Sequence, residues 1–556
     1  MFNRFIHIAR FLFGMGCWVV LVSPIAHAEA VYQWATPVTE VTAAAIGGAH
    51  PTAYLWIPPK CERVRAVILA QNNMIEQDIL QSADFRDRMS QLGIAEIWVN
   101  PPFNQFTSFD GAEQQVDQIV DDLADESGYS ELKYASIIPM GHSAMASYPW
   151  NFAALMPQRT LCVLSIHGDA PLTDRTGNGR PNPNWGNRTI DGIPGLMVEG
   201  EYEWAEDRVQ PALAFEASHP KACLAFLPDA ANSHFYASTE LITFLAFFIG
   251  EAIKYRLPTD SPIDAVPSLT PINPSHGWLI DRWRGQNPPT APAAPYADYK
   301  GDRAEAFWCF DKKMADYIEH YIAGPRSKLP QLIGFRQDGV DLPVKGDFTG
   351  TAIPFKPLAD GITFKLSGYF LKTVPSGNPE MWTGQPAGSS VGHMPGGKIV
   401  FSRIVGPVEQ ISPGTFQIHF NRVGTIDTRS SNTIWLMARQ PGNAVYKQAE
   451  QQGMMRIPLR NTVGEAQTIT FPPISDQKQG VKSLFLNAVS SSGANVQYYV
   501  VSGPAKIVGD RLIFTPIPPR AKFPIAVTVV ACQYGRETAP PLQTAQLVTR
   551  KFEITR

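Results

Sequence analysis

The sequence predicts an α/β fold followed by antiparallel β-sandwich modules. Between Thr52 and about Pro258, short apolar runs alternate with stretches of helical period, which indicates right-handed βαβ units and a largely parallel sheet. From about Leu329 onward, apolar and polar residues alternate in short stretches broken by Gly, Pro and Asn, a pattern typical of antiparallel strands. The length of 556 residues accommodates several domains of about 100–200 residues each.

The first 28 residues are typical of a secretory signal peptide. Arg4 and Arg10 provide positive charge, residues 11–22 form a short apolar stretch, and residues 26–28 (Ala-His-Ala) place small residues where a signal peptidase cleaves. We therefore expect a secreted or periplasmic protein with no membrane attachment after cleavage. The oligomeric state is left open by the sequence.

Charge and cysteine content narrow the function classes. A net charge of −3 with 17% charged residues provides no basic surface for nucleic acid, so nucleic acid is not an expected partner. The cysteines that follow the predicted signal peptide are odd in number and far apart, which indicates neither a disulfide framework nor a metal-ligand pattern. The sequence does not exclude a single disulfide bond between two of them. These cysteines are Cys61, Cys162, Cys223, Cys309 and Cys532.

The α/β part is expected to span residues 29–258. Each predicted strand is a run of about 4–8 β-prone residues, and helix-like stretches follow several of them. The predicted strands lie within residues 65–70, 95–100, 134–141, 161–168, 195–200 and 222–229. The helix-like stretches are residues 78–93, 111–128, 147–155 and 238–257.

Three further sections follow the α/β part. Residues 259–328 are predicted to form a strap rich in Pro and Ala, with one helix-like segment at 302–324. Residues 329–464 are predicted to form a β-sandwich, and residues 465–556 a final β module. Within this module, residues 467–517 contain a Thr-rich first strand, "SSSGANVQYYVVSGPA" and a "GDRLIF" hairpin, which resemble the immunoglobulin-like (Ig-like) modules of bacterial secreted proteins. The resemblance implies a role as spacer or support.

Ser143 is the strongest candidate for a nucleophile. It follows the apolar run of residues 134–141 and precedes a helix-like stretch, so it is expected at the carboxyl end of a strand, where α/β folds place catalytic residues. A serine on such a sharp turn needs small neighbours two residues before and after it; Gly141 meets this requirement and Met145 departs from it. The alternative is a structural serine in a tight connection.

A serine nucleophile needs a base, and the base needs an orienting carboxylate. In this fold class the chain order is serine, acid, histidine. His234 lies in the loop after the predicted strand at 222–229, which is where the base is expected. Glu201, Glu203 and Glu206 follow the strand that ends at Gly200, and any of them is in order for the acid.

Residues of about 50–257 resemble the α/β-hydrolase superfamily through "GHSAM", "LMVEGEYEWAEDR" and "NSHFY". The resemblance implies Ser143 as nucleophile, His234 as base and an acid after the strand-ending Gly200. In that family the acid often lies three residues beyond such a glycine, which favours Glu203, with Glu201 or Glu206 as alternatives.

An oxyanion hole requires two N–H groups directed at the developing negative charge. The first is expected from Ala144, the residue after the nucleophile, and the second from the loop after the strand at 65–70, where Gln71 or Asn72 is the candidate. A simple Asn-rich turn is the alternative interpretation of this loop.

Other histidines and one loop were candidates for different roles. His142 is expected to pack or to hydrogen-bond a neighbouring strand, and His167 to line the pocket or to be a core histidine. The loop at 173–185 has some spacing of a calcium site, but Trp185 stands where such a loop needs a bidentate glutamate. A Gly/Pro/Asn-rich lid over the active site is the plainer interpretation of this loop, so no metal is expected. The serine-hydrolase reaction also requires no cofactor.

The sequence thus predicts an exported serine hydrolase that cleaves carboxylic esters through an acyl-enzyme. The export signal and the β modules favour a bulky ester substrate, such as an esterified polysaccharide or a polyester. Two alternatives stay open: a serine peptidase, and a binding or adhesion protein whose hydrolase-like domain is inactive.

Overall fold

The computed structural model describes residues 31–173, 181–285, 287–345, 350–421 and 431–556. The predicted signal peptide (1–28) and much of the loop at 173–185 lie outside these ranges. Among the helices within them, none has both the length and the apolar character needed to cross a membrane. The cysteines in the described part of the chain are all buried, and each has a free thiol.

An eight-stranded sheet forms the centre of the α/β domain, in the order β1-β2-β4-β3-β5-β6-β7-β8. β1 and β2 are antiparallel to their neighbours, and the strands from β4 to β8 are parallel. This sheet confirms the predicted α/β class and its largely parallel character. Its strands are β1 (Trp34–Pro37), β2 (Thr52–Trp56), β3 (Ala66–Gln71), β4 (Ile94–Asn100), β5 (Ser136–His142), β6 (Val163–Ile166), β7 (Pro194–Gly200) and β8 (Cys223–Asp229).

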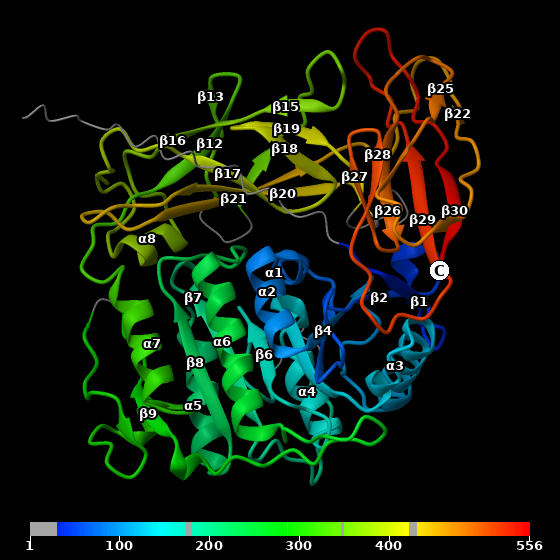
Figure 1. The fold of residues 1–556 in the computed structure, drawn as a ribbon. Helices are drawn as coiled ribbons and strands as arrows, with labels where there is room; N and C mark the ends of the chain where they lie inside the picture. Colours follow the sequence, from blue (N-terminus) through cyan, green and yellow to red (C-terminus); the bar gives the residue numbers. More distant parts are fainter. Residues whose placement is uncertain (1–30, 174–180, 286, 346–349, 422–430) are drawn as a thin grey trace, which may run out of the picture.

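Helices flank this sheet (Figure 1). Capping side chains start two of them: the Ser82 hydroxyl accepts the N–H of Phe85, and the Ser238 hydroxyl accepts the N–H of Leu241. The helices are α1 (Glu76–Gln81), α2 (Ala83–Leu92), α3 (Ala112–Ser127), α4 (Tyr148–Leu155), α5 (Glu206–Ser218) and α6 (Thr239–Arg256). Short 3-10 turns are η1 (Ala44–Ile46), η2 (Ser130–Lys133), η3 (Ser143–Met145) and η4 (Glu201–Glu203).

The segment predicted as a strap packs against the α/β core. Phe307 and Trp308 are buried in the same hydrophobic cluster as the central sheet. The predicted helix at 302–324 begins only at Lys312, because Asp311 caps it by accepting the N–H of Met314 and the residues before it form a buried strand. The elements are η5 (Pro274–His276), β9 (Trp278–Asp281), β10 (Ala294–Pro295), η6 (Arg303–Glu305), β11 (Ala306–Cys309) and α7 (Lys312–Ala323).

The β-sandwich domain, which we define as residues 329–464, contains the sheets β14-β21-β20-β17, β15-β19-β18 and β13-β12-β16. Its pairs are antiparallel except β14 with β21. The elements are β12 (Ile333–Gln337), β13 (Val340–Asp341), β14 (Thr351–Ile353), β15 (Thr363–Lys365), β16 (Ser367–Phe370), α8 (Asn378–Thr383), β17 (Val400–Val405), β18 (Val408–Ser412), β19 (Thr415–Ile418), β20 (Thr433–Gln440) and β21 (Ala449–Arg456).

The Ig-like module, defined as residues 465–556, is also rich in antiparallel sheets, which fits the predicted β-sandwich class. Its sheets are β23-β30-β29-β26, β24-β28-β27 and β22-β25, with one parallel pair, β23 with β30. The strands are β22 (Ile469–Thr470), β23 (Gln477–Lys478), β24 (Ser483–Phe485), β25 (Val489–Ser490), β26 (Gln497–Ser502), β27 (Ala505–Val508), β28 (Arg511–Phe514), β29 (Ile525–Cys532) and β30 (Val548–Thr555).

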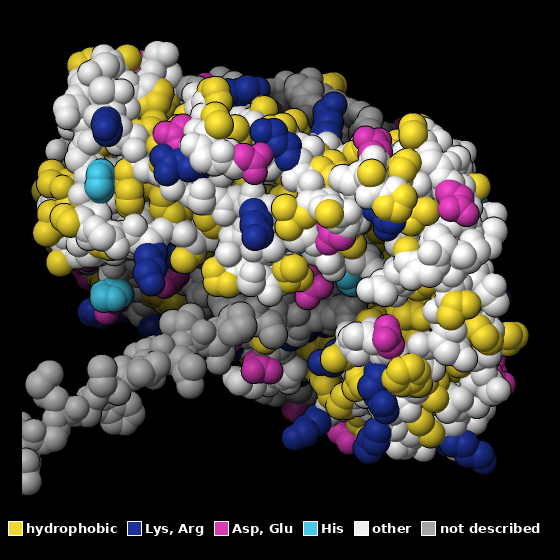
Figure 2. All heavy atoms as spheres, turned by 90° about the horizontal axis from the view of Figure 1, so that it is seen from above, with side chains coloured by type: hydrophobic (Ala, Val, Ile, Leu, Met, Phe, Trp, Pro, Cys, Tyr) yellow, Lys and Arg dark blue, Asp and Glu magenta, His cyan; other side chains and the backbone are white. Residues whose placement is uncertain are grey.

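The β-sandwich domain lies above the edge of the α/β sheet at which β7 and β8 end (Figure 1). The contact is apolar in part, because Ile404, Val405 and Met437 are buried in the same cluster as the residues of the parallel strands. Seen from above, the face of the molecule carries acidic and basic side chains intermixed with hydrophobic ones (Figure 2). This outer face therefore provides no field of a single sign.

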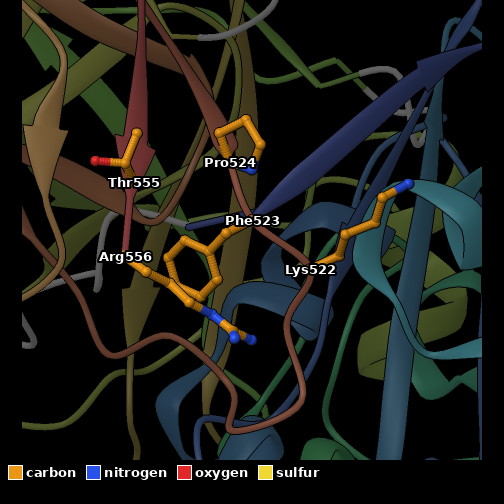
Figure 3. A pocket seen from close by; sticks show the side chains of 5 residues that line it. All are labelled: Lys522, Phe523, Pro524, Thr555 and Arg556. Atoms are coloured by element: carbon orange, nitrogen blue, oxygen red, sulfur yellow. The ribbon is translucent and has the colours of Figure 1, made fainter.

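The Ig-like module contacts the α/β domain at the end of α3. The Lys522 N–H donates to the carbonyl of Ser127 at 2.8 Å, and Arg520 forms an ion pair with Glu131 at 2.7 Å. A pocket beside this contact is remote in sequence from the candidate nucleophile, and its lining has no side-chain carboxylate or imidazole (Figure 3). Its lining residues are Lys522, Phe523, Pro524, Thr555 and Arg556.

Candidate active site

Ser143 lies on a strained turn between β5 and α4. Its φ of 52° falls in the left-handed region that residues other than glycine seldom adopt. A Cβ at Gly141 would overlap the carbonyl oxygen of Met145, which explains why glycine is needed two residues before the serine. Met145, two residues after it, is buried in a hydrophobic cluster that also contains Tyr148 and Phe152.

Ser143, His234 and Glu203 form a continuous hydrogen-bonded chain. The Ser143 hydroxyl lies 2.7 Å from Nε2 of His234. On the other side of the ring, Nδ1 of His234 hydrogen-bonds to the Glu203 carboxylate. This arrangement matches the roles of nucleophile, base and orienting acid in a catalytic triad.

The three side chains come from the ends of three strands. Ser143 follows β5, Glu203 ends the η4 turn that follows β7, and His234 lies in the loop after β8. The N–H of Gly200 donates to Oε1 of Glu203 at 3.0 Å, and Arg208 donates to Oε2 at 3.0 Å. Both contacts fix the carboxylate in front of the histidine.

The two alternative acids have other partners. Glu201 forms a buried ion pair with Lys447 at 2.5 Å and accepts the N–H of Ala231 at 2.8 Å. Glu206 accepts two hydrogen bonds from Arg282, at 2.5 and 2.6 Å. Glu203 is therefore the candidate acid that the geometry favours among the three.

The surroundings shift the pKa values in the direction that a triad needs. Burial lowers the pKa of His234 below its ordinary value of 6.5, although Glu203 acts in the opposite direction. Burial acts to raise the pKa of Glu203, but the charges of His234 and His167 and their hydrogen bonds hold it well below 4.5. At neutral pH these shifts favour a neutral imidazole facing an ionised carboxylate.

A second histidine shares the same acid. Nδ1 of His167 hydrogen-bonds to Glu203, and its Nε2 lies 3.6 Å from Oδ2 of Asp229. Asp229 in turn accepts hydrogen bonds from Tyr321 at 2.5 Å and Asn232 at 2.6 Å. Burial acts to lower the pKa of His167, but the carboxylates of Glu203 and Asp229 outweigh it and raise this pKa above 6.5.

Sequence reasoning placed His167 in the core or the pocket and did not connect it to the acid. His167 follows β6 and Asp229 ends β8, so both lie at the strand ends where Ser143 and Glu203 were expected. Their predicted position at the strand ends is the feature of the sequence that could have indicated a place in the site. The left-handed φ of 47° at His167, which directs the side chain, could not be read from the sequence.

His142 hydrogen-bonds to the backbone of the candidate base, His234. Its Nε2 donates to the backbone carbonyl of His234 at 2.8 Å, and Asn73 donates to the carbonyl of His142 at 2.8 Å. Burial and the neighbouring histidines hold the pKa of His142 well below 6.5, so its ring is neutral. The sequence predicts packing or a hydrogen bond to a neighbouring strand, and the hydrogen bond goes instead to the loop that carries His234.

The structure uses the predicted oxyanion residues in different ways. Ala144 follows the nucleophile at the start of η3, as expected. The Gln71 side chain is fully buried and holds the loop at 103–104, donating to the Asn104 carbonyl at 2.6 Å, and the Asn72 N–H donates to the Val99 carbonyl at 2.8 Å. A second oxyanion donor from Gln71 or Asn72 stays a prediction, because these groups already have partners in this structure.

Glu76 shapes the loop that was expected to supply that donor. Its buried carboxylate accepts the N–H groups of Asn73 at 3.2 Å and Met74 at 2.8 Å, and that of His142 at 2.8 Å. The same carboxylate therefore joins the loop after β3 to the residue before the nucleophile. Burial raises the pKa of Glu76 to about 7.

His167, Glu203 and His234 also have the composition of a metal site, with ligand atoms within 4.8 Å of one another. Both imidazoles bind the Glu203 carboxylate through Nδ1, so hydrogen bonding accounts for the cluster. The calcium-like loop at 173–185 lies partly outside the described residues. Its Trp185 is buried and donates to Asn151 at 2.9 Å.

No protein-family model and no curated protein sequence matches the chain. Among solved structures, a siderophore hydrolase from Aspergillus nidulans is 13% identical, with 44% of this chain and 99% of that one covered and a TM-score of 0.29. A dienelactone hydrolase from Anabaena variabilis is 13% identical, with 40% and 96% covered and a TM-score of 0.26. Est1E from Butyrivibrio proteoclasticus is 17% identical, with 37% and 96% covered and a TM-score of 0.26.

The α/β domain is a mostly parallel eight-stranded sheet flanked by helices, which is the α/β arrangement that the sequence predicts. The sequence identities to these structures are low, and the fold by itself does not determine the chemistry of the site.

Proposed function

We propose that this chain is a serine hydrolase that cleaves carboxylic esters. The observation that carries the proposal is the 2.7 Å contact between the Ser143 hydroxyl and Nε2 of His234, with Glu203 on the opposite nitrogen. A serine hydroxyl is a weak nucleophile near neutral pH, and this contact gives its proton an acceptor.

The reaction has two halves. In the first, Ser143 attacks the ester carbonyl while His234 takes its proton, and the proton then passes to the departing alcohol, which leaves an acyl-enzyme. In the second, His234 takes a proton from water, the water attacks the acyl carbonyl, and the bond between the acyl group and Ser143 breaks as His234 returns the proton to the serine oxygen. Glu203 stabilises the imidazolium that forms in each half and keeps the ring in the required tautomer.

Negative charge develops on the carbonyl oxygen in both halves. We infer that the N–H of Ala144 supplies one donor to that oxygen, because it directly follows the nucleophile. The second donor is proposed from the loop after β3, where Gln71 and Asn72 are the candidates. Using the Asn72 N–H would require it to leave the Val99 carbonyl.

The polymer substrate and the export of the chain are further parts of the proposal. The β modules that follow the α/β domain favour a large extracellular ester, such as an esterified polysaccharide or a polyester. Release of acetyl or feruloyl groups from a panel of glycans, with soluble short-chain esters as reference, tests this part. Cleavage of the soluble esters with no release from any polymer would contradict it.

The activity itself is tested with p-nitrophenyl acetate. Ser143→Ala is expected to lower kcat by on the order of 10⁶-fold, because the triad acts as a unit. Ser147→Ala, in the same turn, is the matched control and is expected to retain activity. Equal, negligible rates in the wild type and Ser143→Ala would favour the inactive binding protein. Cleavage of peptides and not of esters would favour the peptidase.

A further inference from the structure

The loop that carries His234 is held from the β-sandwich domain as well as from its own domain. This base loop, residues 229–235, runs between β8 and the start of α6, and Ala231 within it has a left-handed φ of 61°. A loop with such a residue keeps one conformation only where its surroundings determine it. The partners of the base loop are therefore relevant to where the imidazole lies.

Glu450 binds the residue next to the base. Oε2 of Glu450, on β21, accepts the N–H of Ser233 at 2.8 Å. The Glu450 side chain is buried, and Gln448 donates to its other oxygen at 2.8 Å. An acceptor on the backbone of Ser233 restrains the position of His234 directly, because the two residues share a peptide bond.

Gln448 binds two more groups of the base loop. Its side-chain amide donates to the Ala231 carbonyl at 3.0 Å and to the side-chain oxygen of Asn232. Arg439, on β20, donates to the Gln448 side-chain oxygen at 2.5 and 2.9 Å, which fixes the orientation of the amide. The Gln448 amide therefore restrains both Ala231 and Asn232.

Charge and packing strengthen the same contact. The buried ion pair of Lys447 with Glu201 joins the domains beside the base loop, and Glu201 accepts the Ala231 N–H. The ring centroids of Phe235, in the base loop, and Trp435, in the β-sandwich domain, lie 5.1 Å apart. Removing either partner of the ion pair would leave the other charge buried without a counter-ion, which is strongly destabilising.

We propose that the β-sandwich domain is part of the active site, with Glu450 and Gln448 as positioning residues for the base His234. The inference rests on the proposed function, since it gives these residues a role in the geometry of that triad. It assigns the domain a task that a spacer or support does not have. A displacement of about 1 Å in a catalytic group can cost on the order of 100-fold in rate, so small movements of the base loop are sufficient.

The test uses the full chain with Glu450→Ala, Glu450→Gln and Gln448→Ala, and Glu409→Gln as the matched control. Glu409 is an exposed glutamate of β18 in the same domain. Hydrolysis of p-nitrophenyl acetate is expected to show kcat lowered by about 10- to 100-fold in Glu450→Ala, with KM within twofold. Glu450→Gln is expected to recover part of this loss, because its amide oxygen can accept the Ser233 N–H whereas its –NH2 group cannot accept from Gln448. Glu409→Gln is expected to match the wild type.

A second readout is independent of hydrolysis. NMR of histidine-labelled protein reports the Nδ1–H resonance of His234 and its titration, and both are expected to change in Glu450→Ala and Gln448→Ala while thermal unfolding shows folded protein. An unchanged resonance together with an unchanged kcat in both variants would overturn the inference. If the wild type cleaves no ester, the proposed function fails, and the resonance still decides whether Glu450 positions His234.

Discussion

Nε2 of His234 lies 2.7 Å from the hydroxyl oxygen of Ser143, although 91 positions of the chain separate the two residues. The contact joins the end of β5 to the loop after β8. Because the carboxyl ends of parallel strands meet at one edge of a sheet, the fold brings these residues together without any local sequence relationship.

Replacing Glu203 tests whether this residue is the acid that orients His234. Glu203→Gln is expected to lower kcat by on the order of 10⁴-fold, because an amide does not hold the imidazole in the required tautomer. Glu206→Gln is the control, since Glu206 pairs with Arg282 and is expected to leave kcat within a few-fold of the wild type. A larger loss in Glu206→Gln than in Glu203→Gln would reassign the acid. Steady-state kinetics at pH 8 measure both.

The pH dependence of kcat/KM reports the base. Hydrolysis needs neutral His234, and burial lowers the pKa of this group below 6.5. The rate is therefore expected to rise with pH through an apparent pKa below 6.5 and to be level at neutral pH. A rate that falls as pH rises from 5 to 7 would be inconsistent with a histidine base.

His167 is expected to affect the pH at which kcat/KM rises. Its positive charge acts to lower the pKa of His234, so His167→Gln is expected to move the rise of kcat/KM to higher pH while most activity remains at pH 8. His219→Gln, on a histidine that contacts Phe215 at the end of α5, is the control. A profile that stays in place in His167→Gln would show that the charge of His167 does not act on the base.

Gly141→Ala tests the geometry of the turn. The added Cβ overlaps the carbonyl oxygen of Met145, so the free energy of unfolding is expected to fall by about 1–3 kcal/mol or more. At Gly250, within α6, nothing lies near the new Cβ, so Gly250→Ala is expected to gain up to about 1 kcal/mol from helix propensity. Urea denaturation measures both, and an undisturbed Gly141→Ala would mean that the turn is less tight than described.

The fold class could be predicted because it depends on local patterns of apolar residues, whereas the catalytic roles of Ser143, Glu203 and His234 stay predictions that their contacts support. Strand-like runs placed Ser143, Gly200 and His234 at strand ends, and the structure brings Ser143, Glu203 and His234 together at one edge of the sheet. The choice among the glutamates came from the resemblance to the α/β-hydrolase superfamily, because spacing alone left three in order.

The rest depends on contacts between distant segments. His167 hydrogen-bonds to the acid Glu203, and Asp229 contacts the other nitrogen of His167. The Gln71 side chain binds the loop at 103–104. No local pattern in the sequence indicates these contacts. The predicted helix at 302–324 failed at its start because apolar residues at 306–309 pair as a strand with β9. The contact of Glu450 with Ser233 joins residues 217 positions apart, so its existence required the structure.

The most direct test of the central claim is covalent labelling with a fluorophosphonate, followed by intact-mass measurement and peptide mapping. A single adduct on Ser143 is expected in the wild type, absent in Ser143→Ala and formed much more slowly in His234→Ala. An unlabelled wild type, or an adduct on another serine that persists in Ser143→Ala, would contradict the assignment of Ser143 as the nucleophile.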